Sequence, residues 1–397
     1  MADVVLKAGR VRPVWAGHPW VFAQAVERIT GQAAAGDEVR VLDAKGHVLG
    51  RGLYSPASAI RVRLYTRDGE QPLDAAFLLR RLGEALARRQ RFGLPGDGTD
   101  AFRVLNAEGD GLPGLVVDQL GDVSLLQFST LGMKQRQAEV VEAVKNLLPS
   151  RAIVDRTPPK SAALEGFEPG TGVIAGDEAL DTLRFEEHGL RFEVPLQIGQ
   201  KTGFYLDLRQ LRKRLGELAR GRQVLDCYSY IGAAGLSMAR GGATEVLSVD
   251  SSELAVNVAR HCVALNQLGD RMRVERMQAQ AALERAAAQG GVDLVLCDPP
   301  KLAPKRSALD RALRAMEALA EGALRATRPG GIAVVCSCSA GLGMAELERA
   351  LAVGAARAGR RATVLERIFQ DADHPVPAAF PEGLYLSTLI AEVSLDR

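Results

Sequence analysis

Hydrophobic and polar positions alternate in short runs along the first 72 residues, and glycine and aspartate turns separate these runs. Alternation with a period of two is typical of strands that bury one face. Residues 14–24, which contain both tryptophans, interrupt the alternation and predict a helical turn. We therefore expect residues 1–72 to form a small β-barrel-like domain. Its predicted strands are residues 4–6, 38–42, 47–53 and 60–65.

Residues 73–185 mix helical and strand periodicities. Over residues 74–92, apolar side chains recur every three or four positions, which predicts an amphipathic helix. Its other face is rich in arginine, and a charged helix face is usually a solvated one. Strand-like runs surround a second helix, so we expect an α+β middle domain. The arginines are Arg80, Arg81, Arg88, Arg89 and Arg91; the predicted strands are residues 102–105, 114–118, 123–129 and 151–155, and the second helix is residues 134–148.

From about residue 186 to residue 397, strands alternate with helices. This pattern predicts a mostly parallel sheet with helices on both faces, so the chain as a whole is an α/β multidomain protein. Ligands of such sheets bind outside the carboxyl ends of the strands, near the point where the strand order reverses. The predicted strands are residues 223–227, 245–250, 273–276, 293–297 and 331–338, with helices starting at residues 234, 253, 279 and 307.

Composition adds few constraints. The 397 residues include 50 Lys+Arg and 48 Asp+Glu, so the net charge of +2 gives no general preference for nucleic acid, and any basic surface must be local. The five cysteines are odd in number, which argues against a disulfide framework and favours a reducing cytoplasm. We expect no membrane span and no secretion leader, because no apolar run is long enough and the first ten residues lack an apolar core.

Glycines follow the first strand of the α/β region, in Asp226-Cys-Tyr-Ser-Tyr-Ile-Gly232-Ala-Ala-Gly235. Glycines in a strand–helix turn let the backbone approach a ligand closely, although a complete G-x-G-x-x-G is missing here. The second strand ends at Asp250, where an acid commonly holds a ribose hydroxyl. The alternative role of a helix N-cap suits Ser251 or Ser252 better. Together these features favour an adenosine-containing cofactor.

The fourth and fifth strands end in residues suited to catalysis. Cys297-Asp298-Pro-Pro-Lys301 predicts a rigid turn with Asp298 at its lip, and Cys336-Ser-Cys338 ends the fifth strand. If the two strands are neighbours, Asp298 and Cys338 reach one substrate ring as an acid and a nucleophile. The alternative is a structural turn and cysteines that merely fill space. We assign that filler role to Cys336. A lone C-x-C lacks four metal ligands, so no metal is expected.

These motifs carry a family resemblance over essentially the whole chain. The sequence resembles the bacterial large-subunit (23S) rRNA cytosine-C5 methyltransferases that have an N-terminal PUA domain, which are class I S-adenosylmethionine enzymes. The matching segments are Gly9-Arg-Val-Arg12, Gly17-His-Pro-Trp20-Val-Phe22, Asn106-Ala-Glu-Gly-Asp-Gly-Leu-Pro-Gly114, Gly199-Gln-Lys-Thr-Gly-Phe-Tyr-Leu-Asp-Leu-Arg209, Asp226-Cys-Tyr-Ser-Tyr-Ile-Gly232, Asp298-Pro-Pro-Lys301, Ser337-Cys-Ser339, and Asp373-His-Pro375 with Pro381-Glu-Gly-Leu-Tyr-Leu386.

The resemblance implies roles for individual residues. It makes Cys338 the nucleophile and places Asp298 in the motif that contacts the target base, and Leu208 and Gln278 depart from the family pattern. At Gln278 an amide replaces the aspartate that usually contacts the adenine, and its oxygen can accept the same hydrogen bond. The implied cofactor residues are Lys201, Thr202, Phe204, Asp226, Tyr228, Gly232, Asp250 and Gln278, and the implied substrate residues are Pro299, Lys301, Arg10 and Arg12.

The implied partner is large-subunit rRNA, with S-adenosylmethionine as cofactor. The base that removes the carbon 5 proton stays open among Asp298, a water molecule and His374, although a packing role is favoured for His374. For Trp15 and Trp20 we favour core packing over base stacking. Two other functions remain open: methylation of a base amino group, and a catalytically silent assembly factor with the same fold. The sequence does not determine the target cytosine, the choice between naked rRNA and a ribosomal particle, or the oligomeric state, a homodimer included.

Overall fold

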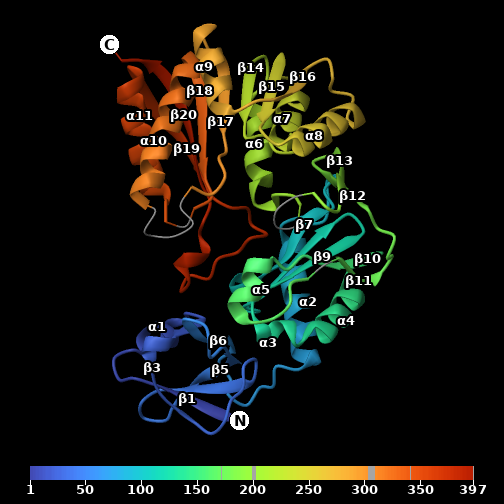
Figure 1. The fold of residues 1–397 in the computed structure, drawn as a ribbon, viewed down its shortest axis with the longest axis vertical. Coiled ribbons are helices and arrows are strands. Elements are labelled where there is room, and N and C mark those ends of the chain that lie inside the picture. The colour runs from blue at the N-terminus through green and yellow to red at the C-terminus, as the bar shows by residue number, and fades with distance from the viewer. Residues whose placement is uncertain (171, 199–202, 303–308, 340, 397) are drawn as a thin grey trace. The chain divides into compact units, whose positions relative to one another are not determined.

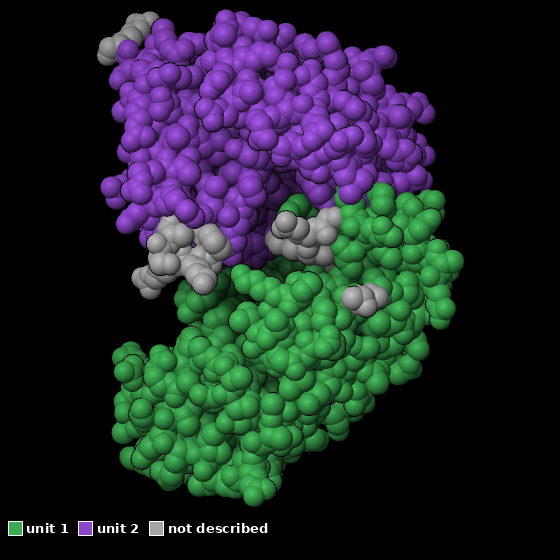
Figure 2. Space-filling view, in the orientation of Figure 1, with its two compact units in different colours: residues 1–186, 195–206, 372–383 green, residues 187–194, 207–371, 384–397 purple. Residues whose placement is uncertain are grey.

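A computed structural model describes residues 1–170, 172–198, 203–302, 309–339 and 341–396 (Figure 1). The chain divides into two compact units, coloured separately in Figure 2. Unit 1 contains Met1–Glu186, Pro195–Leu206 and Ala372–Gly383, and unit 2 contains Glu187–Val194, Asp207–Asp371 and Leu384–Arg397. Each unit therefore includes segments that are far apart in the sequence.

The first sheet of unit 1 has six strands in the order β2-β6-β5-β4-β1-β3. Alternate residues such as Val39, Val41 and Val62 are buried, as the period of two predicts. Strand β3 (Val26–Thr30) was not predicted, because four of its five residues are exposed and it lies at the sheet edge. The other strands are β1 (Ala2–Leu6), β2 (Trp20–Phe22), β4 (Glu38–Leu42), β5 (Val48–Tyr54) and β6 (Ile60–Thr66), and helix α1 is Arg12–Ala16.

The second sheet of unit 1 has the order β11-β10-β9-β8-β7. Helix α2 (Ala75–Arg91) begins where the Asp74 carboxylate accepts a hydrogen bond from the Phe77 N–H at 2.9 Å, and it buries Phe77, Leu78 and Leu82. The remaining elements are β7 (Ala101–Asn106), β8 (Leu115–Leu120), β9 (Val123–Phe128), α3 (Leu131–Lys134), α4 (Gln137–Leu147), β10 (Ala152–Asp155), α5 (Pro159–Glu165) and β11 (Gly172–Gly176).

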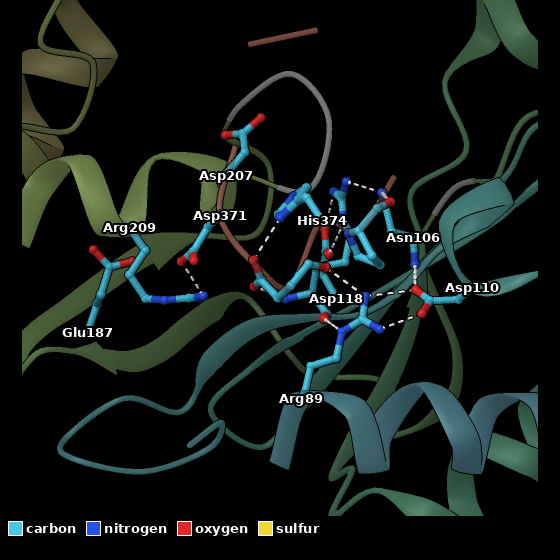
Figure 3. A network of polar contacts seen from close by, with 12 residues as sticks. Arg89, Asn106, Asp110, Asp118, Glu187, Asp207, Arg209, Asp371 and His374 are labelled. Carbon is cyan, nitrogen blue, oxygen red and sulfur yellow. Dashed lines mark hydrogen bonds and ion pairs between the residues drawn. The ribbon is translucent and has the colours of Figure 1, made fainter. Parts of the chain in front are cut away.

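One arginine of helix α2 does not belong to a solvated face. Arg89 is only 1% exposed, and its guanidinium donates to both carboxylate oxygens of Asp110 at 2.6 and 2.7 Å (Figure 3). The expectation of a solvated arginine face is therefore wrong for Arg89. The reason is geometric, because a bidentate carboxylate and three backbone carbonyls satisfy the buried cation.

The segment Ala372–Gly383 is part of unit 1, although it lies near the end of the chain. Arg89 donates to the carbonyl of Asp373 at 2.6 Å, and the Arg103 N–H donates to the Asp373 carboxylate at 2.9 Å. His374 is 2% exposed, and its Nδ1 lies 2.8 Å from that carboxylate. This burial agrees with the packing role favoured for His374.

Trp20 packs within unit 1, as predicted. Its ring lies edge-on to Phe380 with centroids 4.6 Å apart, and its Nε1 donates to Glu108 at 2.8 Å. Trp15 differs, because 72% of its surface is exposed. The prediction of core packing is therefore wrong for Trp15, which projects from a helix that buries only Val14.

Unit 2 is built on a seven-stranded sheet in the order β16-β15-β14-β17-β18-β20-β19. Strands β14 to β18 pair in parallel, and β20 alone runs in the opposite direction, pairing antiparallel with β18 and β19, so the predicted mostly parallel sheet is confirmed. The strands are β14 (Gln223–Cys227), β15 (Glu245–Asp250), β16 (Met272–Arg276), β17 (Val292–Cys297), β18 (Thr327–Ser337), β19 (Arg360–Ile368) and β20 (Ser387–Leu395); a hairpin, β12 (Thr182–Glu187) and β13 (Leu190–Pro195), precedes them in the chain.

Helices cover both faces of this sheet (Figure 1). Helices α9, α10 and α11 pack together on one face, while α7 and α8 contact β14, β15 and β16. In the described part of the chain, no helix is both long and apolar enough to cross a membrane. The helices are α6 (Arg209–Leu218), α7 (Ala233–Arg240), α8 (Glu253–Leu265), α9 (Ala279–Ala288), α10 (Leu309–Ala326) and α11 (Met344–Ala358).

Two ion pairs fix the start of α6 within unit 2. Arg209, 2% exposed, pairs with Asp371 (Figure 3), and Arg212 donates to both oxygens of the Glu187 carboxylate at 2.5 and 2.6 Å. Asp207 accepts a hydrogen bond from the Tyr385 hydroxyl at 2.6 Å. The two ion pairs join Glu187 and Asp371 to α6, and the hydrogen bond joins Tyr385 to the residue Asp207 just before this helix. Helix α6 leads into the first parallel strand, β14.

Candidate active site

The strand order reverses between β14 and β17. These two strands are far apart along the chain but lie side by side in the sheet. Ligands of doubly wound sheets bind at the carboxyl ends of the strands at this point. The residues that follow β14, β15, β17 and β18 therefore define the candidate site, and all of those discussed below belong to unit 2 unless stated otherwise.

The turn after β14 has an unusual backbone. Tyr228 and Tyr230 have φ angles of 61° and 51°, and Gly232 has a φ of 76°. Non-glycine residues rarely adopt this left-handed conformation, and such residues cluster at functional turns. The Tyr230 N–H donates to the Asp250 carboxylate at 2.9 Å, so Asp250 stabilises this turn.

Glycines at the start of α7 permit close packing against the sheet. A Cβ at Gly235 would lie 2.3 Å from Ser248 Oγ, and one at Gly232 would lie 3.0 Å from Met272 Cε. Only glycine fits at Gly235 without displacing its neighbours. Ser229 Oγ is buried in the same turn and has no hydrogen-bond partner among the described residues. The turn thus offers a ligand a polar atom that the protein leaves unsatisfied.

Asp226 is a buried carboxyl group at the end of β14. It is 1% exposed and accepts a hydrogen bond from Ser248 Oγ at 2.8 Å. Burial, with a smaller contribution from the nearby Asp298 and Asp250 carboxylates, raises the pKa of Asp226 to about 7. The site therefore holds an acid that titrates near neutral pH.

Asp250 ends β15, as predicted, and Gln278 follows β16. The second carboxylate oxygen of Asp250 accepts a hydrogen bond from the Ser252 N–H at 2.8 Å. Ser252 is the N-cap of α8, as the residue pattern favoured. Gln278 precedes α9, its side chain makes no capping hydrogen bond, and it is exposed. Its amide is therefore accessible at the edge of the sheet.

Strands β17 and β18 are neighbours, which meets the condition set for Asp298 and Cys338. Cys297 is in register with Val335, so Asp298 follows one strand directly and Cys338 follows the other. Burial raises the pKa of the Cys336 thiol, and the nearby Asp298 carboxylate and Cys338 thiol raise it further. The tertiary structure thus brings the predicted acid and thiol to one edge of the sheet.

The cysteines differ in exposure. Cys338 is half-buried, whereas Cys227, Cys262, Cys297 and Cys336 are buried. Burial raises the pKa of the Cys336 thiol, and Thr388 Oγ1 donates to its sulfur at 3.3 Å. A buried thiol with a raised pKa is a poor nucleophile, so Cys336 has the properties of a filler residue. None of the five cysteines forms a disulfide.

The remaining predicted residues lie in varied surroundings. Lys201 and Thr202 are outside the described residues. In unit 1, Phe204 is 4% exposed and packs against Phe185 with centroids 4.9 Å apart. Pro299 is buried and Lys301 is exposed beyond β17, while Arg10 and Arg12 are exposed in unit 1. Leu208, the other departure from the family pattern, lies in the short 3₁₀ helix that precedes α6.

Two contributors to the site were not identified from the sequence. Tyr230 was quoted only as part of a motif, and its positive φ has no signature in the residue type. Ser248 lies within β15 and is fully buried, and its hydroxyl donates a hydrogen bond to the Asp226 carboxylate. A serine within an apolar strand was the available signal, because a buried hydroxyl requires a partner. Among the described residues, no group of three or more His, Cys, Asp or Glu side chains is arranged to hold a metal.

Two family matches cover most of the chain. Residues 4–67 match the PUA-like domain, and residues 168–378 match the S-adenosylmethionine-dependent methyltransferases. The chain is 37% identical over 398 residues to ribosomal RNA large subunit methyltransferase I of Alteromonas mediterranea, with 100% of both chains covered. It is also 37% identical over 394 residues to the protein of that name from Escherichia coli O157:H7, with 98% of this chain and 99% of the relative covered.

Solved structures share the fold. A methyltransferase structure, SMU.776 complexed with S-adenosylhomocysteine (SAH), superposes with a TM-score of 0.84 at 19% identity and covers 98% of this chain and 100% of its own. An S-adenosylmethionine-dependent methyltransferase structure from Streptococcus mutans gives a TM-score of 0.82 at 18% identity, with the same coverage. At such low sequence identity, these similarities show a shared fold and nothing further.

The site suits the cofactor of this family. The glycines of the Asp226–Gly235 turn allow a ligand to approach the backbone closely, and Ser229 in this turn has an unsatisfied hydroxyl. The Asp250 carboxylate stands at the end of β15. Together these features fit an adenosine and an amino-acid moiety. S-adenosylmethionine is accordingly the cofactor. From its full-length relatives and its matched domains, this chain belongs to the S-adenosylmethionine-dependent methyltransferases, in the family of ribosomal RNA large subunit methyltransferase I.

Proposed function

We propose that this chain methylates carbon 5 of a cytosine in large-subunit ribosomal RNA, with Cys338 as a covalent nucleophile. The observation that carries this proposal is the pairing of Asp298 and Cys338 at the ends of the neighbouring strands β17 and β18, with Cys338 half-buried and Cys336 buried. The names of the full-length relatives support rRNA as the substrate. An amino-group methyltransferase would have no need of a thiol at this position.

The chemistry requires such a thiol because carbon 5 of cytosine is a poor nucleophile. In the proposed reaction the Cys338 thiolate adds to carbon 6, forming an S–C bond and placing electron density on carbon 5. S-adenosylmethionine, when bound, supplies the methyl group. A base then removes the carbon 5 proton, and the S–C bond breaks to release Cys338. A free cysteine thiol has a pKa of about 8.5 and is mostly protonated at neutral pH, so the proposed reaction requires the site to favour the thiolate form of Cys338.

Asp298 is proposed to contact the cytosine ring. In its protonated form it donates a hydrogen bond to the ring nitrogen and stabilises the charge that develops when Cys338 adds. Pro299 fixes the turn, and the Lys301 ammonium favours the thiolate electrostatically. His374 is not assigned as the base that removes the proton, because its imidazole is buried in contact with Asp373 in unit 1.

We assign the cofactor to the residues around the β14 turn. Asp226, Tyr228 and Gly232 shape the turn, Asp250 accepts from the ribose hydroxyls, and Gln278 accepts from the adenine amino group. Lys201, Thr202 and Phe204 are proposed for the methionine side. Residues 1–72 are proposed as an RNA-binding domain, with Arg10 and Arg12 as phosphate contacts, residues 73–185 as a middle domain, and residues 186–397 as the methyltransferase domain.

Methyl transfer to RNA tests this proposal directly. Labelled S-adenosylmethionine is incubated with deproteinised large-subunit rRNA and wild type, Cys338→Ala or the matched control Cys336→Ala. Nucleoside digestion then identifies the labelled product. We expect 5-methylcytidine from wild type and Cys336→Ala, and its loss with Cys338→Ala. If Cys338→Ala still transfers methyl groups, the covalent mechanism is wrong; a labelled amino-methylated base would assign a different reaction.

A further inference from the structure

The indole of Trp15 is exposed without a visible structural purpose. It is 72% exposed, whereas Val14, its neighbour in α1, is 2% exposed and anchors the helix. No aromatic ring of the described residues contacts it, in contrast to Trp20. Leaving a large apolar ring in water is unfavourable, so an exposed tryptophan commonly marks a contact surface.

Basic residues lie beside Trp15 in α1, in the segment just before that helix, and at Arg67, whose side chain contacts the Trp15 backbone. Arg12 lies three residues before Trp15 in α1, so the two share one face of the helix. Arg67 Nη2 donates to the Trp15 carbonyl at 3.3 Å. Arg10 forms the turn just before α1, where its N–H donates to the Lys7 carbonyl at 3.1 Å. We call Lys7, Arg10, Arg12, Trp15 and Arg67 the Trp15 patch.

The charges of this patch are uncompensated. Lys7, Arg10, Arg12 and Arg67 are exposed, and none of them forms an ion pair with a carboxylate of the described residues. Among the described residues, the Arg67 guanidinium donates to the carbonyls of Leu49 and Trp15. Asp68, the residue after Arg67, is also exposed, and Glu382 of unit 1 pairs with His18 at 3.5 Å. The patch is therefore a local basic surface on a chain whose net charge is only +2.

An aromatic face combined with unpaired cations is the chemistry of single-stranded nucleic acid binding. Bases stack on exposed aromatic rings, while arginine and lysine neutralise phosphates. An acidic peptide would satisfy the cations but would give the indole no stacking partner. A duplex would hide its bases and leave only the phosphates to contact. The arrangement therefore favours one unpaired nucleotide with its flanking phosphates.

We propose that the Trp15 patch binds an unpaired RNA nucleotide, with its base stacked on the Trp15 indole and its phosphates held by Arg10, Arg12, Lys7 and Arg67. This inference rests on the proposed RNA substrate and extends it, because it assigns a specific contact outside the catalytic unit. It also explains why Arg12 and Trp15 occupy the same helix face.

Equilibrium binding of a fluorescein-labelled 12-nucleotide single-stranded RNA to the full-length protein tests the proposal. Trp15→Ala should weaken binding about tenfold, a change within the range measured for loss of one stacking contact. Trp15→Phe should retain most of the affinity because it keeps an aromatic face. Phe92→Ala is the matched control, since Phe92, directly after helix α2, is 64% exposed outside the patch, and it should bind like wild type.

Two further measurements identify the mode of contact. In Trp20→Phe, the only tryptophan left is Trp15, so quenching of its fluorescence by RNA reports stacking directly. In Arg10→Ala/Arg12→Ala, the slope of log K against log salt concentration should fall by about 1.4, the contribution of two phosphates on a single strand. Circular dichroism of each variant establishes that the fold is retained.

Each result separates this inference from the proposed catalytic function. Unchanged RNA affinity in Trp15→Ala, equal affinity for a blunt duplex, or Trp15-dependent binding of polyglutamate would overturn the patch assignment, the last by showing a protein partner. Cys338→Ala should bind RNA like wild type. Trp15-dependent binding without methylated product would instead refute the proposed catalysis, while methylation with normal binding by Trp15→Ala would refute only the patch.

Discussion

The raised pKa of Asp226 makes the stability of unit 2 depend on pH. In the unfolded chain this carboxyl group has a pKa of 3.8, and in the folded protein burial raises it to about 7. Between these values the folded protein holds a proton that the unfolded chain has released. The free energy of unfolding therefore falls as the pH rises from about 4 to about 7, and it becomes constant with respect to this group above that range.

The size of the effect follows from the shift. One pKa unit corresponds to about 1.4 kcal/mol, so the whole shift amounts to about 4 kcal/mol. A rise from pH 5 to pH 8 crosses about two pH units of the interval between the two pKa values, which predicts that the free energy of unfolding falls by about 2.5 kcal/mol. Asp226→Asn has no carboxyl group to ionise and can still accept the hydrogen bond from Ser248. It should lose less stability than wild type over the same pH interval.

Urea unfolding at pH 5 and pH 8 measures this difference. Circular dichroism follows unit 2 together with unit 1, and tryptophan fluorescence follows unit 1 alone because Trp15 and Trp20 both lie there. The variant should gain about 2.5 kcal/mol relative to wild type on going from pH 5 to pH 8. Asp270→Asn, at an exposed position of unit 2, is the control and should show no such gain. A pH-independent difference between Asp226→Asn and wild type would refute the assignment of a buried, neutral Asp226.

Two other substitutions test the packing described above. Arg89→Met should lower the free energy of unfolding of unit 1 by about 3–5 kcal/mol, because it leaves the buried Asp110 carboxylate without its bidentate partner. The control Arg80→Met, at an exposed position, should change this free energy by less than about 1 kcal/mol. Denaturation followed by tryptophan fluorescence measures both effects, and equal effects would contradict the buried-pair interpretation. Gly235→Ala should cost about 1–3 kcal/mol and weaken S-adenosylmethionine binding in calorimetry, because its methyl group would lie 2.3 Å from Ser248 Oγ. Gly269→Ala, with open space around it, is the control, and an unaffected Gly235→Ala would show that α7 can shift away from the sheet.

Much of unit 2 could be predicted from the sequence because its signals are local. Strand β14 and strand β15 were predicted with their observed bounds, and Asp250 was expected at the end of the second strand. Strands buried on both faces give continuous apolar runs, and the residues that follow them lie together whenever neighbouring strands are parallel. Asp298 and Cys338 could therefore be predicted from the sequence alone to lie together, on the condition that their strands were adjacent.

Strand adjacency itself was decided by the tertiary structure. The order of β14, β17 and β18 depends on which strands bury the most apolar surface against each other and the helices, and local patterns do not encode it. The same limit applies to β3, whose exposed edge position removes the alternation on which strand prediction depends.

Charged and aromatic residues show the limit most clearly. Arg89 is buried although other arginines of α2, such as Arg80, are exposed, and Trp15 is exposed although Trp20, five positions later, is half-buried. Arg89 is buried because Asp110 and the carbonyl of Asp373, 284 residues away in sequence, supply its hydrogen bonds. Residue type and periodicity thus determined the elements and the chemistry at the strand ends. Only the folded chain determined which polar groups found buried partners, because those partners come from segments distant in the sequence.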